Sequence, residues 1–178
     1  MRIATILVLL FAISCAPAEE KTSSSFPISP EQDAILLVVD EFFLALGSAD
    51  IDAFKALHSA KATNVVVLPE GDEAVRYRTI DEAIEGMRAG PFPKIRERYW
   101  DPVVLERNGL AVVWTPYSID IDGARSHCGV DVFNMTKHGP DWKIDSVSFT
   151  VEPSACEEFK PGENSAIRPD FSALGAEE

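Results

Sequence analysis

Two residues that could do acid–base chemistry, His127 and Asp131, are four positions apart in the sequence. Residues four apart on a β-strand face the same side and lie about 13 Å apart, so this pair cannot hydrogen-bond directly without a bend in the strand. A neutral histidine in an apolar pocket can act as a general base, and burial can keep an aspartate protonated. The same two residues could instead be structural groups that line a binding cavity, or His127 could face solvent at the end of its strand.

Other kinds of catalytic site find little support. Ser126 and His127 are adjacent, so they face opposite sides of a strand, and no G-x-S-x-G nucleophile elbow is present. The three histidines are far apart, and neither C-x-x-C nor H-E-x-x-H occurs, so we expect no metal site and no cofactor. The segment from Asp120 to Gly123 begins like a calcium loop but lacks the later ligands, and it is typical of a hairpin turn.

The strands that position these residues follow from the hydrophobic pattern. From Ile95 onward the sequence alternates as β-strands do, and two-residue turns separate the runs. Asn-Gly and Asp-Gly favour such turns because both central residues readily adopt positive φ. The predicted strands cover residues 95–106, 110–121, 125–137 and 141–151, and the predicted turns are Asn108-Gly109, Asp122-Gly123 and Gly139-Pro140.

Helices are predicted before this meander. A capping box at Ser29 and Gln32 begins the first helix, Asp50 caps a short second one, and a further capping box at Thr79 and Glu82 begins a third. Helices followed by an antiparallel meander predict an α+β fold with the helices on one face of the sheet.

The turns also predict a register, and the register assigns side chains to two faces. The Asp-Gly turn pairs Ser118 with His127 and Trp114 with Asp131, and the Asn-Gly turn pairs Tyr99 with Ser118. One face thereby combines aromatic walls with convergent polar groups, as small-molecule pockets do. The ligand-binding residues predicted on it are Tyr99, Asp101, Trp114, Ser118 and Phe133, beside the catalytic candidates His127 and Asp131.

The opposite face of the predicted sheet is apolar. An exposed apolar surface of that size is rare on a monomer, so we expect a homodimer that buries it. The residues assigned to this face are Ala111, Val113, Tyr117, Val130, Val132, Val147, Phe149 and Val151.

Several segments resemble the SnoaL-like, nuclear-transport-factor-two-like superfamily. The segments Gly123–Phe133 and Asp141–Ile144 resemble its final hairpin, and Trp100–Val103 and Val113–Tyr117 resemble exported bacterial members of unassigned activity. The resemblance covers Gln32–Val151. It implies a curved antiparallel sheet that N-terminal helices wrap into a cone with a pocket at its mouth, and many members dimerise through the outer sheet face.

The resemblance implies no single activity, because this scaffold hosts isomerases, dehydratases, cyclases and pure binders. A tyrosine and an aspartate in one cone are similar to the arrangement in steroid isomerases. Here Tyr99 or Asp131 would be the hydrogen-bond partner of a His127 general base.

The N-terminus resembles an export signal. A positive start precedes an apolar run that is shorter than the roughly 20 residues needed to span a bilayer. The run ends in a lipobox-like segment with Cys15 as the lipidated residue, or in an ordinary cleavage site after Ala18. We expect a periplasmic or cell-envelope lipoprotein, or alternatively a secreted protein. The predicted segments are a signal peptide (1–18), a flexible tether (19–29), the cone domain (30–152) and a loose C-terminal tail (153–178).

Export leaves two cysteines in the mature chain, Cys128 and Cys156. Two thiols in an oxidising compartment are candidates for a disulfide, which would close a loop of about 28 residues and stabilise the fold by roughly 3 kcal/mol. The alternative is two unpaired cysteines, one buried in a strand and one in the tail.

The overall charge narrows the possible partners. The sequence has 16 Lys and Arg against 29 Asp and Glu, a net charge of −13, and no basic cluster. This excludes a nucleic-acid partner and leaves a lipid anchor at Cys15 as the only expected contact with a membrane.

We expect an exported domain that binds a small, partly apolar molecule. The alternatives are a cofactor-free enzyme of the isomerase or dehydratase type with His127 as general base, and an envelope interaction module without turnover.

Overall fold

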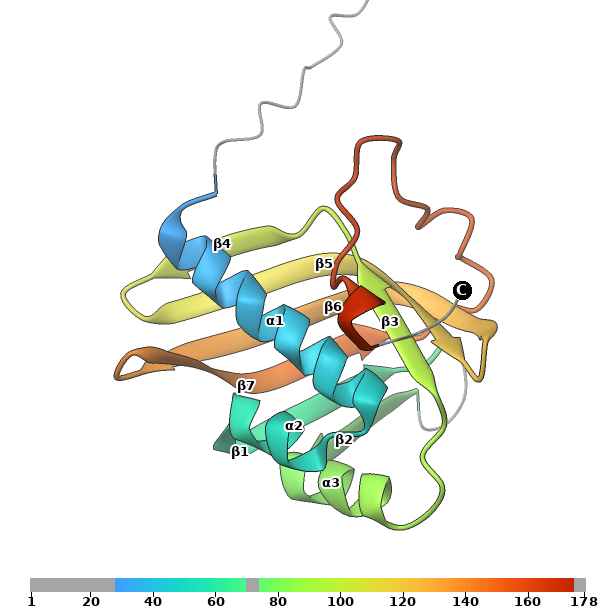
Figure 1. The fold of residues 1–178 in the computed structure, drawn as a ribbon, viewed down its shortest axis with the longest axis horizontal. Helices are drawn as coiled ribbons and strands as arrows, with labels where there is room; N and C mark the ends of the chain where they lie inside the picture. Colours follow the sequence, from blue (N-terminus) through green and yellow to red (C-terminus); the bar gives the residue numbers. More distant parts are fainter. Residues whose placement is uncertain (1–27, 70–73, 175–178) are drawn as a thin grey trace, which may run out of the picture.

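The computed structural model describes residues 28–69 and 74–174 of the 178-residue chain. The predicted signal peptide, Cys15 and most of the tether lie outside these residues. The elements are α1 (Pro30–Ser48), α2 (Ile51–Leu57), β1 (His58–Val67), β2 (Val75–Thr79), α3 (Ile80–Arg88), β3 (Ile95–Tyr99), β4 (Val103–Arg107), β5 (Leu110–Ile121), β6 (Ala124–His138), β7 (Asp141–Thr150) and the 3₁₀-helix η1 (Phe171–Leu174). The three α-helices precede the meander β3–β7, as expected, but the strands β1 and β2 lie between the second and third helices (Figure 1).

Two helices begin at the capping boxes that the sequence predicts. Ser29 Oγ accepts a hydrogen bond from Gln32 N (3.1 Å), and the Gln32 side chain accepts one from Ser29 N (3.0 Å). Thr79 and Glu82 form the same arrangement at the start of α3. Each box satisfies backbone donors that the first turn of a helix leaves free. Within the residues that the structure describes, no helix combines the length and the apolar character needed to cross a membrane.

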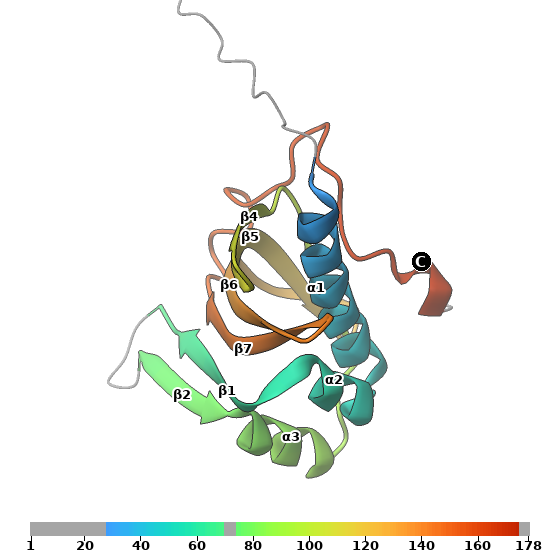
Figure 2. The same cartoon turned by 90° about the vertical axis from the view of Figure 1, so that its left-hand side faces the viewer.

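The seven strands form one curved sheet in the order β2-β1-β7-β6-β5-β3, with β4 also paired to β5 (Figure 2). The pair β1–β7 is parallel, and the other pairs are antiparallel. β5 is long enough to pair with β4 along its first half and with β3 along its second. The single strand predicted over 95–106 is therefore broken into two, at Asp101 with its positive φ of 47° and the following Pro102.

Helix α1 lies across one face of the sheet, which we call the inner face, and the opposite side is the outer face (Figures 1 and 2). The core fills the space between α1 and the inner face. Its centre is a cluster of aromatic rings, in which Phe42 and Phe43 of α1 both meet Phe133 of β6 edge-on, with centroids 5.3 and 5.8 Å away. Such edge-to-face contacts add to the stabilisation from apolar burial.

The register predicted after the Asp122-Gly123 turn is wrong by one residue, because a β-bulge inserts Ser126 into β6. Every predicted pair of β5 and β6 beyond the bulge is shifted by one residue. Because side chains alternate along a strand, the shift places the predicted partners on opposite faces of the sheet. The observed pairs are Ile119–His127, Ser118–Cys128, Thr115–Asp131 and Trp114–Val132. Ser118 therefore does not pair with His127, and Trp114 does not pair with Asp131.

The shift corrects the assignment of residues to the two faces. Trp114 and Ser118 lie on the outer face, whereas Tyr99, which pairs with Tyr117 rather than with Ser118, lies on the inner one. Of the eight residues predicted for the apolar outer face, Val130 and Val132 lie there. Five others belong to the inner face instead: Ala111, Val113, Tyr117, Val147 and Phe149. The eighth, Val151, follows the end of β7.

The C-terminal segment after β7 is fastened to the domain rather than loose. The predicted disulfide between Cys128 and Cys156 is confirmed. Further along, Arg168 forms an isolated antiparallel bridge with Tyr99, and its guanidinium pairs with Asp40 of α1. The segment thus returns over the end of the sheet that carries β3 (Figure 1).

Candidate functional site: a buried carboxyl pair on the inner face

Two carboxyl side chains face the interior from neighbouring parts of the sheet, Glu97 on β3 and Asp131 on β6. The cross-strand pairs place them in successive rows of the inner face: Glu97–Ile119–His127, then Tyr99–Tyr117–Gly129, then Thr115–Asp131–Phe149. The Tyr117 ring lies in the row between the two acids. This group of four residues, Glu97, Tyr117, His127 and Asp131, is the inner site.

Asp131 is the more deeply buried acid, with 2% of its surface exposed. Its Oδ2 atom has no hydrogen-bond partner within the described residues. Burial, together with the nearby Glu97 carboxyl, raises the pKa of Asp131 well above its usual value. The environment of Asp131 therefore favours the neutral form of its carboxyl.

Glu97 is 8% exposed and has neither a hydrogen bond nor an ion pair with a described residue. Burial raises the pKa of its carboxyl to about 8. A group with this pKa is mostly protonated at neutral pH but still keeps an ionised fraction, so it can donate or accept a proton there.

Tyr117, which lies between the two acids, is held in place by a hydrogen bond to the backbone of the sheet. Its hydroxyl donates a hydrogen bond to the backbone oxygen of Thr150 (2.7 Å), and burial followed by the charges of Asp131 and Glu97 raises the pKa of this hydroxyl. The close approach of β6 to Thr150 requires a glycine at position 129, because a Cβ atom there would clash with the same Thr150 oxygen. Tyr117 is thus a fixed and permanently protonated wall of the inner site.

His127 lies at the more open end of the inner site. It is half-buried, its ring meets that of Tyr117 edge-on at 5.8 Å, and its Nδ1 lies 3.0 Å from Ser126 Oγ. Burial lowers the pKa of its imidazole, so the ring is neutral at pH 7. Exposure falls from His127 through Glu97 to Asp131, so His127 is the member of the inner site that is nearest to solvent. His127 and Asp131 share a face but make no direct hydrogen bond.

The other residues predicted for the site lie elsewhere. Tyr99 donates its hydroxyl hydrogen to Asp40 Oδ1 (2.7 Å), so that group is already engaged with α1. Phe133 is fully buried among the rings of the core. Asp101 is exposed at the break between β3 and β4, where its Oδ2 accepts a hydrogen bond from Ser165 (2.5 Å).

Trp114 and Ser118 are outer-face residues and do not line the inner site. Trp114 is 43% exposed in the middle of β5. Ser118 is 7% exposed although it faces outward, because the C-terminal segment covers that end of the sheet.

Glu97 is the site residue that sequence reasoning missed. It lies between Arg96 and Arg98, a pattern that is typical of a solvated strand. The available signal was its position two residues before Tyr99, because alternate residues of a strand share a face and Tyr99 was already assigned inward.

The described residues contain no group of three or more His, Cys, Asp or Glu side chains that could hold a metal ion. The inner site therefore offers hydrogen bonding and proton transfer through its own side chains. In their protonated forms, which burial favours, its two carboxyls can donate hydrogen bonds, and they can also give up protons to a basic ligand.

Comparison with known proteins identifies the scaffold. No family model matches the sequence, and no curated protein matches it. Solved structures do match, among them an NTF2-like protein from Cytophaga hutchinsonii with a TM-score of 0.54, 17% identity, and coverage of 69% of this chain and 99% of that one. This chain has the NTF2-like fold.

Two further structural neighbours differ in the activity assigned to them. A candidate dehydratase from the NTF2-like family of Streptomyces avermitilis aligns with a TM-score of 0.53 and 16% identity, over 69% of this chain and 98% of its own. The β subunit of a candidate aromatic-ring-hydroxylating dioxygenase from Novosphingobium aromaticivorans aligns with a TM-score of 0.58 and 14% identity, over 68% and 89%. At these identities the likeness extends to the fold alone, and the inner site must be interpreted from its own residues.

Proposed function

We propose that this protein is an exported small-molecule-binding protein whose inner site anchors the ligand through Glu97 and Asp131. The observation that carries the proposal is the buried carboxyl pair, in which Asp131 Oδ2 has no hydrogen-bond partner among the described residues and burial raises the pKa of both carboxyls. Buried polar groups in folded proteins are nearly always paired, so an unpaired one calls for a partner such as a water molecule, an ion or a ligand. A ligand with hydrogen-bonding groups would supply the missing partners.

The charges of the inner site limit the chemistry of that ligand. A neutral carboxyl can donate a hydrogen bond to a carbonyl or ether oxygen, and an amine can take its proton and form an ion pair. An anionic ligand would be repelled as soon as either acid ionised. The ligand is therefore uncharged or cationic, and it is partly apolar because Ile119, Tyr117 and Phe149 share the same rows of the inner face.

Export is the second part of the proposal. The apolar N-terminal run and the lipobox at Cys15 support it. The disulfide between Cys128 and Cys156 supports it independently, because such bonds persist in oxidising compartments. The mature protein would be a periplasmic or envelope lipoprotein, or a secreted protein if cleavage follows Ala18. The mass of the mature N-terminal peptide separates these outcomes.

The outer face supports a homodimer as the form of the mature protein. One row of cross-strand pairs on this face runs through Val103, Trp114, Val132, Ser148, Val65 and Tyr77. Three of these, Val103, Trp114 and Tyr77, are exposed. A two-fold contact would bury this row against its own copy.

Native mass spectrometry of the mature protein, purified from cells that export it, tests ligand binding. The wild-type protein should retain a small molecule, and Asp131→Asn and Glu97→Gln should lose it because each removes one acidic group. The matched control is Asp141→Asn, an exposed aspartate at the start of β7, which should retain the molecule. Wild-type protein without a bound molecule, or equal retention by all four proteins, would contradict the proposal.

A second candidate function is cofactor-free acid–base catalysis of the isomerase or dehydratase type. The observation that favours it is that Glu97, with a pKa near 8, and the neutral His127 share one face, so a proton donor and a proton acceptor coexist at neutral pH. As a general base, His127 should contribute about a hundredfold or more to turnover, with little effect of His127→Ala on binding. In a pure binder the same change should weaken binding by about one hydrogen bond, roughly 0.5–1.5 kcal/mol. An envelope interaction module with a filled cone would show neither effect.

A further inference from the structure

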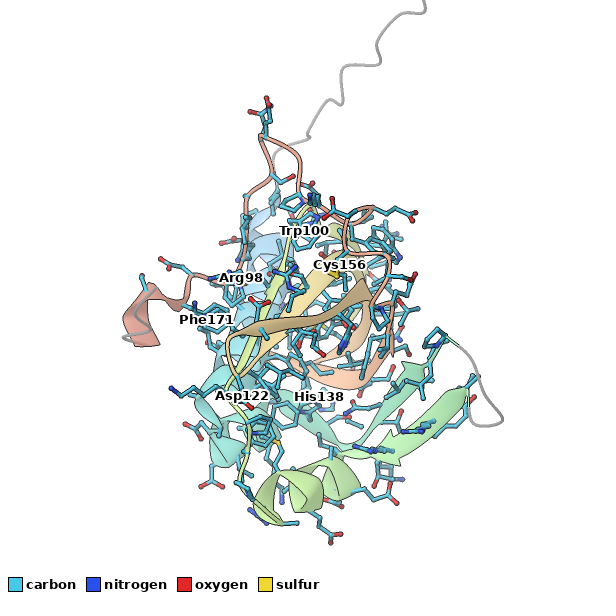
Figure 3. The ribbon with its side chains drawn as sticks, turned by 90° about the vertical axis from the view of Figure 1, so that its right-hand side faces the viewer. Arg98, Trp100, Asp122, His138, Cys156 and Phe171 are labelled. Carbon is cyan, nitrogen blue, oxygen red and sulfur yellow. A yellow bond between two sulfur atoms is a disulfide. The ribbon has the colours of Figure 1, made fainter. Side chains whose placement is uncertain are left out.

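The outer face carries a second feature, a small hollow beneath the C-terminal segment. Its floor is a row of paired residues, Arg98 on β3, Ser118 on β5 and Cys128 on β6. The disulfide from Cys128 to Cys156 holds the C-terminal segment above this floor, and Phe159 of that segment forms part of the wall. The hollow has a volume of about 120 Å³. Figure 3 shows Arg98 near Cys156 at this end of the molecule.

The hollow is basic in an acidic protein. Arg98, Arg125 and Lys160 line it and none of its lining residues is acidic, although the whole chain has a net charge of −13. A concentration of positive charge in a concave surface favours an anionic ligand.

Two of the three cations already have partners. Arg125 Nε pairs with Asp120 Oδ1 at 2.6 Å, and Lys160 pairs with the exposed Glu157. Arg98 is different: the residue is half-buried, and its guanidinium makes no hydrogen bond, ion pair or ring contact with any described residue. The hydroxyl of its cross-strand neighbour Ser118 also has no such partner. An unpaired guanidinium next to an unpaired hydroxyl is a ready set of donors for an oxyanion.

The walls of the hollow are apolar. The ring of Trp100, which is almost fully buried, and the side chains of Phe159 and Ile167 line it beside the donors. An inorganic anion would leave these groups unused, whereas an organic acid would use both the donors and the walls.

We propose that this hollow binds a small organic carboxylate. The carboxylate accepts hydrogen bonds from the Arg98 guanidinium and the Ser118 hydroxyl, and its apolar part packs against Trp100 and Phe159. Because the disulfide holds the covering segment in place, binding depends on the oxidised state of Cys128 and Cys156. This site lies on the opposite face of the sheet from the inner site and does not depend on the function proposed there.

Titration with benzoate tests the proposal, with the indole N–H signal of Trp100 and the backbone amide of Ser118 followed by NMR. Benzoate should bind saturably, and uncharged benzyl alcohol should not. Arg98→Gln should weaken benzoate binding roughly tenfold or more, the usual effect of losing a charge-assisted hydrogen bond. The matched control Arg88→Gln, on the exposed side of α3, should leave it unchanged. Reduction of the disulfide should also weaken binding.

Four results would overturn the proposal: no saturable binding of benzoate, equal binding of benzyl alcohol, tighter binding of inorganic phosphate than of benzoate, or unchanged affinity in Arg98→Gln. If Arg98→Gln does not fold, Ser118→Ala replaces it. That variant removes one donor and should weaken benzoate binding several-fold, and unchanged binding would equally overturn the proposal.

Discussion

Arg168 and Tyr99 meet twice, through their backbones and through a shared carboxylate. Their backbones exchange two hydrogen bonds of 2.7 and 2.8 Å, while the Tyr99 hydroxyl and the Arg168 guanidinium both donate to Asp40, at 2.7 and 2.5 Å. The C-terminal segment, the sheet and α1 are therefore joined at one point that is half-buried. The Tyr99 hydroxyl is therefore engaged at this junction. Tyr117, and not Tyr99, is the tyrosine that lies between the two acids of the inner site.

The first prediction concerns this junction. Arg168→Ala should lower the free energy of unfolding by about 1–3 kcal/mol, because it leaves the half-buried Asp40 carboxylate without its cation. Urea denaturation measures the effect. Lys160→Ala is the control, since it breaks an ion pair with Glu157 that is largely exposed and should cost about 0–1 kcal/mol. Equal losses in the two variants would show that the junction adds no stability.

The disulfide gives a second prediction. Cys156→Ser removes the bond that closes a 28-residue separation, and it should lower the free energy of unfolding by roughly 3 kcal/mol because the unfolded chain gains entropy. Reduction of the wild-type protein should give a similar loss in urea denaturation. In unreduced, denatured wild-type protein, thiol labelling should modify neither Cys128 nor Cys156. Labelling of both would count against the bond.

A third prediction follows from the raised pKa values. Glu97 holds its proton in the folded protein up to a pKa of about 8 but releases it near its ordinary value of 4.5 when unfolded. The folded state then binds more protons, so stability falls as the pH rises towards 8. Between pH 6.5 and 8 the loss should be roughly 2 kcal/mol. Burial lowers the pKa values of His58 and His127 in the folded protein. Below pH 6.5 these two residues therefore make the stability rise as the pH rises.

Glu97→Gln should reduce this pH dependence above pH 6.5, because the amide stays neutral at every pH, while Asp131, whose pKa is also raised, keeps its own contribution. The control Glu106→Gln, exposed on β4, should leave the slope as in the wild type. Urea denaturation at a series of pH values measures both. A wild-type stability that is flat or rising between pH 6.5 and 8 would mean that the acids of the inner site are not held neutral.

The fourth prediction concerns the homodimer. Val132→Lys places a charge in the centre of the outer-face row and should shift the protein to a monomer, because the dimer would bury that charge without a partner. Sedimentation equilibrium measures the change. Leu37→Lys, at an exposed apolar position on α1 away from the outer face, should leave the dimer intact. A wild-type protein that is monomeric at high micromolar concentration would exclude the dimer.

Local signals predicted the elements of the fold well. Capping boxes at Ser29 and Thr79 mark the starts of α1 and α3, and the turn residues Asn108, Asp122 and Gly139 all adopt positive φ. These signals need only a few neighbouring residues, so a single sequence contains them. The α+β class followed from them, whereas the NTF2-like fold was predicted from the resemblance of segments such as Gly123–Phe133 to that superfamily.

The pairing of side chains across the sheet was harder to predict. The bulge at Ser126 adds one residue to β6, and no local pattern in the sequence marks it. Because side chains alternate along a strand, this one residue moved Trp114 and Ser118 out of the predicted pocket. The C-terminal segment was expected to be loose from its composition, but its contacts with Tyr99 and Asp40 come from residues far away in the sequence.

The most direct test of this account is a ¹³C NMR titration of the side-chain carboxyl carbons of Glu97 and Asp131 in the ligand-free protein, with Glu97→Gln to assign the first signal. Our account predicts that Glu97 titrates near pH 8 and that Asp131 also titrates well above its ordinary value. Titration of both carboxyls near their ordinary values, about 4, would show that they are ionised at neutral pH. The buried neutral pair, and the ligand site built on it, would then be contradicted.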